Sequence, residues 1–136
     1  MSAQPKFDPA SYKATTRVQW DAAAAAWNDW GPFLRRWLAP ATETMFDMAG
    51  LSAGQRVLDA AAGAGDQTLQ AAVRVGPEGY VLATDISPGI LRFAEANAPA
   101  NGIGCIETQV CDGERLDVPA GAFNLALSRV GMIYFP

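Results

Sequence analysis

The sequence contains no histidine and only two cysteines among its 136 residues. Cys105 and Cys111 lie six residues apart in a segment that we expect to be extended, and six extended residues span roughly 20 Å. A disulfide bond needs a much shorter separation, so the sequence favours reduced thiols and a cytoplasmic location. With no imidazole and two distant thiols, no metal site is expected.

Strong positive charge and long apolar runs are also lacking. The formal net charge is −4, and Arg35 and Arg36 are the only adjacent basic residues. Because no basic face is available to contact phosphates, a nucleic-acid partner is not expected. No stretch approaches the ~20 apolar residues of a membrane span, and the N-terminal residues lack the apolar core of a signal peptide. Stable membrane insertion is therefore not expected.

The composition that remains is ordinary for a globular protein, with 50% hydrophobic and 18% charged residues. We divide the chain into an N-terminal helical lead-in, residues 1–50, and an α/β domain, residues 51–136. Within the lead-in, Met1 to Ala10 is polar and contains two prolines, which predicts an irregular start.

Three helical segments are predicted in the rest of the lead-in. The first begins at Gln19, because five consecutive alanines follow Asp21, and it ends at Gly31-Pro32. The second covers Phe33 to Leu38, and the third runs from Pro40 to Gly50.

All four tryptophans fall within 18 residues of this lead-in: Trp20, Trp27, Trp30 and Trp37. Two interpretations remain open. The rings either fasten the helices onto the rest of the fold, or they form an aromatic lid over a flat or lipophilic substrate.

The stretch from Arg56 to Leu69 organises the α/β domain. A short apolar run predicts a strand that ends at Asp59, and a loop of only alanine and glycine, Ala60 to Gly65, follows it. A helix comes next, predicted by apolar residues at helical spacing: Leu69, Ala72 and Val73. Strand, small-residue turn and helix open a βαβ unit, and this turn lets a ligand approach the backbone closely.

The same pattern continues along the chain. Strands are predicted at Tyr80–Thr84, Ile103–Cys111 and Phe123–Leu127. Ser87-Pro88 provides an N-cap and a first helical residue, and the helix that it starts buries Ile90, Leu91 and Ala94 and stops by Pro99. The fold class is therefore α/β, a Rossmann-like doubly wound parallel sheet with an N-terminal helical extension.

Asp59, Asp85 and Asp112 each end a predicted strand, and they lie 26 and 27 residues apart. Right-handed crossovers bring the carboxyl ends of parallel strands to one edge of the sheet, where ligands bind. We therefore expect the three carboxylates to line one site beside the glycine-rich loop.

The ligand is predicted from the residues around that loop. A dinucleotide-binding turn needs G-x-G-x-x-G/A, but Gly63-Ala64-Gly65 is followed by Asp66, Gln67 and Thr68. The Asp66 carboxylate also stands where a pyrophosphate would lie, and like charges repel. A zwitterionic ligand with a ribose fits better, because strand-end carboxylates accept from ribose hydroxyls and from the adenine amino group. S-adenosylmethionine meets these demands.

The segments VLDAAAGAGDQTL, ATDISPGIL and VCDGERLDVPAGAFNLALSRVGMIYFP resemble motifs I, II and III of class I S-adenosylmethionine-dependent methyltransferases. The nearest resemblance is to the branch of ubiquinone/menaquinone-biosynthesis C-methyltransferases (methyltransferase type 11), and it covers Gln55 to Pro136.

The resemblance implies a role for each matching residue. Asp59, Gly63 and Gly65 would shape the methionine pocket, with Ala61 and Ile86 also at the cofactor. Asp85 would hold the ribose hydroxyls, Asp112 would bind the adenine amine, and the Gly113 N–H would face the adenine ring. Ser128 and Arg129 would border the methionine end. No catalytic base is implied, and Tyr134 is a candidate only by proximity.

The sequence departs from the family pattern in three ways. Ala61 replaces the first glycine of motif I, which is harmless only if its φ is negative. Asn124 stands where aspartate is frequent. The family's sheet has seven strands in the order 3-2-1-4-5-7-6, and four are predicted here. We therefore expect the N-terminal part of a larger enzyme, with a sheet order 3-2-1-4 and a fourth strand that pairs with a missing C-terminal half or self-associates.

The predicted function is the cofactor-binding half of an enzyme that transfers a methyl group to a small, lipophilic or aromatic acceptor. A module that binds a nucleotide or cofactor without chemistry is the first alternative. A nicotinamide-dependent oxidoreductase is the second, and the missing third glycine disfavours it.

Overall fold

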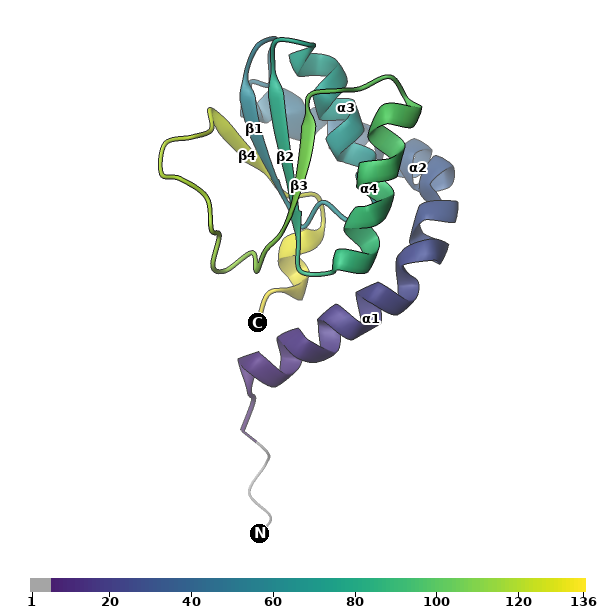
Figure 1. Ribbon diagram of the computed structural model, residues 1–136, viewed down its shortest axis with the longest axis vertical. Helices are drawn as coiled ribbons and strands as arrows, with labels where there is room; N and C mark the ends of the chain where they lie inside the picture. Colours follow the sequence, from purple (N-terminus) through teal and green to yellow (C-terminus); the bar gives the residue numbers. More distant parts are fainter. Residues whose placement is uncertain (1–5) are drawn as a thin grey trace.

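The computed structural model describes residues 6–136, so the first five residues of the predicted lead-in lie outside the described residues. Helices α1 and α2 precede a sheet of four strands with two intervening helices (Figure 1). The elements in order are α1 Pro9–Asp29, α2 Gly31–Ala49, β1 Arg56–Ala60, α3 Asp66–Val75, β2 Tyr80–Asp85, α4 Pro88–Ala100, β3 Ile106–Val110, β4 Leu125–Leu127 and a 3₁₀ turn at Gly131–Tyr134.

The sheet is parallel throughout, with the strand order β3-β2-β1-β4. Asp59 of β1 lies opposite Ala83 of β2 and Leu127 of β4. Strands β1, β2 and β3 therefore end at one edge, and the loops that follow them meet there. The predicted α/β, Rossmann-like fold and its strand order are confirmed.

The main core lies between the sheet, α2 and α3. Phe46 of α2 is fully buried and packs with Val57 of β1, Val81 of β2 and Val75 of α3. Burying a side chain of this size contributes roughly 1.5–3 kcal/mol. Since α2 supplies the largest fully buried side chain, this helix is held firmly against the sheet.

The first helix is longer than predicted. It begins at Pro9 instead of Gln19, because Asp8 caps it by accepting a hydrogen bond from the Ala10 N–H at 3.1 Å. An aspartate followed by proline is a good helix start, and the polarity of the lead-in concealed it. A break between two helices is confirmed, but it falls at Trp30, and Gly31 and Pro32 are the first residues of α2 instead of the end of α1.

The second and third predicted helices form one continuous helix, α2, with Pro40 inside it. Proline cannot donate to the preceding turn and usually interrupts a helix. Pro40 is exposed, and the residues that follow it bury Thr42 and Phe46. Burial of this segment outweighs the lost hydrogen bond.

Smaller differences concern the ends of elements. Val73 is 71% exposed, and Leu69, Ala72 and Val75 form the inner face of α3 instead. Helix α4 includes Pro99 and ends at Ala100, although its predicted inner residues are buried as expected. Strands β3 and β4 are shorter than predicted. Within residues 6–136, no helix is long and apolar enough to cross a membrane.

Candidate functional site

The carboxylate at the end of β1 lies beneath the small-residue loop. Asp59 is fully buried; its Oδ2 accepts from Thr68 Oγ1 at 2.6 Å and its Oδ1 from Gln67 Nε2 at 3.2 Å. Both donors lie in the first turn of α3, so this carboxylate ties the helix to the strand. Burial raises the pKa of Asp59 to about 6, although the hydrogen bonds from Thr68 and Gln67 oppose the shift.

The loop above Asp59 is built from left-handed residues: φ is 58° at Ala61, 62° at Gly63 and 88° at Gly65. A Cβ at Gly65 would collide with Ala94 of α4, so glycine permits close packing there. The alanine at position 61 is strained, because a left-handed L-residue costs roughly 1–2 kcal/mol. Ala61 was expected to be harmless only if its φ is negative, and its φ is positive. A Cβ at Gly131 would collide with the Ala61 methyl group, so these two residues are complementary.

Asp85 closes β2 at the rim of a cavity. It is 9% exposed; its Oδ2 accepts from the Gly63 N–H and its Oδ1 from the Ser87 N–H, both at 3.0 Å. Burial raises its pKa against the effect of these backbone donors. The side chain of Ile86 lines the cavity beside it.

The carboxylate that follows β3 is more accessible. The Asp112 side chain is 29% exposed and pairs with Lys13 Nζ of α1 at 2.6 Å. This hydrogen bond lowers the pKa of Asp112. The ring of Phe135 lies against Gly113, where an added Cβ would collide with it.

The other end of the cavity carries a buried ion pair. Arg129 lies 2.9 Å from Asp66 at the start of α3, and their side chains are 7% and 11% exposed. Arg129 also donates to Thr42 Oγ1 at 3.0 Å, and Arg35 pairs with Asp66 at 2.7 Å. The neighbouring Ser128 Oγ is buried and has no hydrogen-bond partner within residues 6–136.

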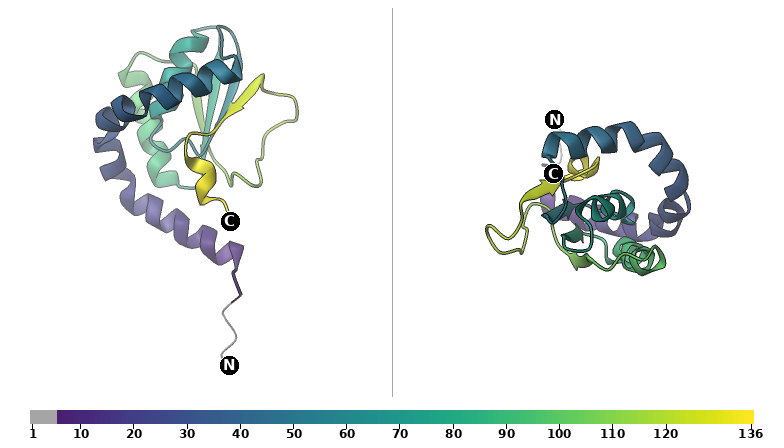
Figure 2. Two further views of the ribbon diagram at one scale, coloured as in Figure 1. Left: turned by 180° about the vertical axis from the view of Figure 1, so that it is seen from behind. Right: turned by 90° about the horizontal axis from the view of Figure 1, so that it is seen from above.

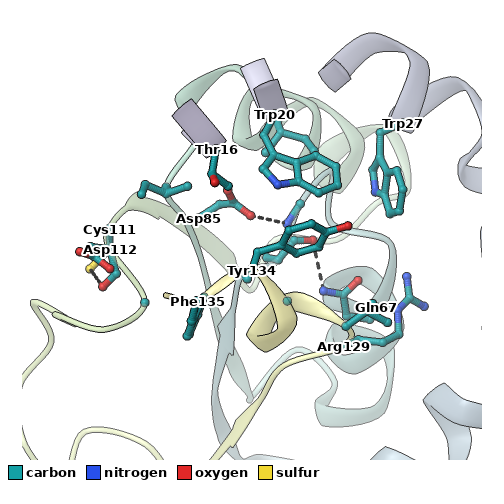
Figure 3. Close-up of a pocket in the computed structure, with 18 of the residues that line it drawn as sticks. Thr16, Trp20, Trp27, Gln67, Asp85, Cys111, Asp112, Arg129, Tyr134 and Phe135 are labelled. Carbon is teal, nitrogen blue, oxygen red and sulfur yellow. Dashed lines mark hydrogen bonds between the residues drawn. The ribbon is translucent and has the colours of Figure 1, made fainter. Parts of the chain in front are cut away.

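Aromatic residues roof the cavity. The Trp20 ring packs edge-to-face on Trp27 and on Tyr134, with centroid separations of 5.3 and 5.2 Å (Figure 3). Trp37 of α2 also lines the cavity, whereas Trp30 does not. Trp20 in addition packs against the buried residues Ala24 and Ile90. The same ring therefore fastens α1 and borders the cavity, so the two interpretations of the tryptophans are compatible.

Most of the predicted site residues line this one cavity: Ala61, Gly63, Asp85, Ile86, Asp112, Gly113 and Arg129. Asp59, Gly65 and Ser128 lie outside the lining. Sequence reasoning missed other lining residues, notably Lys13, Thr16, Gln67 and Phe135. Lys13, Thr16 and Trp20 share one helical face, a signal that required α1 to begin before Gln19.

Comparison with known proteins gives consistent matches. A family profile described as a methyltransferase domain matches residues 57–136. An uncharacterized protein of Mycobacterium tuberculosis is 33% identical over 122 residues, which cover 90% of this chain and 41% of the relative. Aklanonic acid methyltransferase DauC of Streptomyces sp. is 29% identical over 126 residues, which cover 93% of this chain and 56% of the relative.

A solved structure has the same fold. The crystal structure of a SAM-dependent methyltransferase from Aquifex aeolicus superposes with a TM-score of 0.59 at 21% identity, over 90% of this chain and 57% of that one. At this identity the likeness concerns the fold alone. The chain spans 41% and 56% of the lengths of the two curated relatives.

Proposed function

We propose a function from one premise: this chain belongs to the methyltransferase domain family, whose profile matches residues 57–136. The proposed activity is transfer of a methyl group from S-adenosylmethionine to a small acceptor, with this chain providing the cofactor-binding half. One observation carries the proposal. A single cavity is bordered by the left-handed loop after β1, the Asp85 carboxylate and the Asp112 carboxylate.

The chemistry of the cavity fits an adenosyl ligand. Asp85 accepts from the ribose hydroxyls, and Asp112 accepts from the adenine amino group, with Ile86 and the Gly113 N–H beside the ring. The left-handed loop at Ala61 and Gly63 leaves backbone close to the ligand. Each carboxylate oxygen has two acceptor positions, so the backbone donors on Asp85 leave acceptor capacity free.

The methionine end of the ligand lies at Ser128 and Arg129. Ser128 comes directly before Arg129, and its buried hydroxyl lies outside the cavity lining, so it borders this end from behind. The Arg129 guanidinium provides positive charge for a carboxylate. Asp59 and Gly65 act from behind the loop, since they support its conformation without reaching the cavity.

S-adenosylmethionine supplies a methyl group bound to a positively charged sulfur. The contribution of this chain is to position the reactants. Holding the methyl donor and the acceptor in line lowers the activation free energy of the displacement by several kcal/mol. Tyr134 is the candidate catalytic base, which would take a proton from the methyl acceptor, since it lines the cavity and packs against Trp20. No other residue is assigned a catalytic role.

The acceptor is a small lipophilic or aromatic molecule. Trp20, Trp27, Trp37 and Leu34 line the part of the cavity formed by α1 and α2, and flat rings bind well against aromatic side chains. DauC is named as acting on aklanonic acid, which is compatible with an organic acceptor. We also propose that the chain belongs to the ubiquinone/menaquinone branch of the family. The boundary between the helical lead-in and the α/β domain is proposed to lie between residues 50 and 51.

Calorimetric titration tests the cofactor. S-adenosylmethionine and S-adenosylhomocysteine should bind, and NAD should not, because the turn after β1 lacks the third glycine of the dinucleotide-binding pattern. Binding of NAD alone would overturn the proposal in favour of an oxidoreductase. Binding of adenosyl ligands without methyl transfer to any acceptor would favour a binding module.

The open edge of the sheet is a proposed interface. Within residues 6–136, β4 pairs with β1 alone, and the turn that follows exposes Val130, Met132 and Ile133. An unguarded apolar edge pairs readily with another strand, in a C-terminal half or in a second copy. Sedimentation of this chain at micromolar concentration tests self-association, and a monodisperse monomer would contradict it. A cytoplasmic location is proposed on the two free thiols.

A further inference from the structure

We propose that Lys13 of α1 is a positioning residue for the cofactor: its ammonium holds the Asp112 carboxylate in the orientation that accepts the adenine amino group. The inference rests on the proposed function and extends it to the N-terminal helix, which precedes the residues that match the family profile. Lys13 Nζ lies 2.6 Å from Asp112 Oδ2 and 2.6 Å from Glu114 Oε2, and Lys13 lines the cavity.

The two oxygens of Asp112 are held from different sides. Oδ1 accepts from the Glu114 N–H at 2.9 Å, and Oδ2 accepts from Lys13 at 2.6 Å. Since each carboxylate oxygen has two acceptor positions, both oxygens retain capacity for a further donor. Without Lys13, only the Glu114 N–H would restrain this part-exposed carboxylate, and its side chain would be free to rotate away from the cavity.

Lys13 is brought to Asp112 by a second anchor on the same helix. Asp21 Oδ1 accepts from Ser87 Oγ at 2.5 Å and from the Gly89 N–H at 2.9 Å, at the start of α4. A Cβ at Gly89 would collide with Asp21, so glycine permits this close approach. The hydrogen bond from Ser87 lowers the pKa of Asp21, which keeps the anchor charged.

The two anchors place α1 across the site. Asp21 follows Lys13 by eight residues, a rise of about 12 Å and slightly more than two helical turns. One anchor lies beside Ser87, next to the ribose carboxylate Asp85, and the other lies on the adenine carboxylate. Thr16 and Trp20 line the cavity between them. In the left view of Figure 2, α1 runs below the sheet, near the C-terminus of the chain. The helix is thereby set to cover the adenosine end of the ligand.

An ion pair of this kind could instead be a surface contact without functional effect, since exposed pairs contribute little. The two readings differ in what they predict for ligand selectivity. If the Lys13–Asp112 pair is only a surface contact, removing Lys13 changes the affinity of no ligand, whether or not the ligand carries the adenine amine. A positioning residue affects binding only of ligands that use Asp112.

The experiment compares two ligands across matched variants by calorimetry. S-adenosylhomocysteine carries the adenine amine, and S-inosylhomocysteine carries a carbonyl oxygen there and donates nothing to Asp112 from that position. Lys13→Met should weaken binding of the adenosyl ligand about fivefold, the loss expected for one well-placed hydrogen bond, and should leave binding of the inosyl ligand unchanged. Lys13→Arg should retain wild-type affinity for both.

Arg17→Met is the control, because Arg17 is exposed on the same helix one turn later and lies outside the cavity lining. It should bind both ligands as the wild type does. If Lys13→Met does not fold, Lys13→Gln provides the same test with a polar side chain. Equal losses for both ligands, or no loss for either, would overturn the positioning role. Failure of the wild-type protein to bind any adenosyl ligand would instead refute the proposed function.

Discussion

The ends of β1 and β3 both carry an aspartate, but the two regions use that carboxylate differently. Asp59 at β1 is fully buried and is satisfied by the neutral donors Thr68 and Gln67. Asp112 after β3 is 29% exposed and is paired with a lysine from another helix. Burial raises the pKa of Asp59 to about 6, whereas the Lys13 hydrogen bond lowers that of Asp112. The same residue type therefore supports the fold in one region and remains available to a ligand in the other.

The largest expected effect is on folding, at Asp59. Asp59→Ala leaves the Thr68 hydroxyl without its acceptor and leaves the Gln67 amide with the Ala62 carbonyl in place of two acceptors, all in a buried position. Each unsatisfied buried donor costs about 1–3 kcal/mol, so we expect a loss of about 3 kcal/mol in the free energy of unfolding. Urea unfolding measures it, with Asp117→Ala at an exposed loop position as the control. Equal free energies of unfolding for Asp59→Ala and Asp117→Ala would contradict the structural role of Asp59.

The next effect is on binding, at Asp85, whose environment lies between the two extremes. Asp85→Ala should weaken S-adenosylhomocysteine binding at least tenfold, because charge-assisted hydrogen bonds are each worth roughly 1.5–3 kcal/mol. This loss should exceed that of any other single carboxylate change in the cavity. Calorimetry on a variant shown to fold by circular dichroism measures the change. An affinity close to that of the wild type would contradict the ribose role.

Asp112 should show a smaller effect on binding and none on folding. Asp112→Asn keeps a carbonyl acceptor but loses the charge that pairs with Lys13. We expect affinity for adenosyl ligands to fall about fivefold, near the value of a single hydrogen bond, with an unchanged unfolding midpoint. If the Asp112→Asn variant binds as tightly as the wild type at every pH from 5 to 8, Asp112 is a turn residue and the two regions do not differ in function.

The comparison also marks the limit of what the sequence predicts. The positions of Asp59, Asp85 and Asp112 at strand ends follow from hydrophobic runs and their spacing, and the strand order is right. Their environments do not follow, because burial and ion pairing depend on residues distant in the chain. Lys13 lies 99 residues from Asp112, and the helix that carries it was predicted to begin too late. The predicted helix start at Pro40 is wrong for a related reason: burial of the residues that follow it outweighs the local tendency of proline to interrupt a helix.

A pH titration separates the two regions without mutating the site. The folded-state pKa of Asp59 is raised, so between pH 4 and pH 6 the folded protein binds more protons than the unfolded chain, and stability falls as pH rises. From pH 5 to pH 7 the Asp59 contribution should fall by about 1 kcal/mol. Asp112 contributes in the opposite direction, but only at lower pH, because its pKa is lowered. Asp85 contributes a fall in the same direction, because burial raises its pKa too. Asp59→Asn should therefore reduce the fall by the Asp59 share, and an unchanged slope in this variant would assign the whole fall to other groups.

The smallest effect concerns the loop that Asp59 supports. Ala61→Gly relieves a left-handed alanine, which is worth about 1 kcal/mol, but glycine also gains unfolded-state freedom of about 0.5–1 kcal/mol. The two terms nearly cancel, so we expect the unfolding midpoint to change little. Binding should respond more than stability, because removal of the methyl group lets a ligand approach the loop backbone more closely. We therefore expect a modest gain in S-adenosylhomocysteine affinity, measured by calorimetry beside the control Ala53→Gly, which lies outside the cavity lining. A loss of affinity would mean that the Ala61 methyl group, packed against Gly131, holds the loops after β1 and β4 together, and that the alanine is part of the site's architecture.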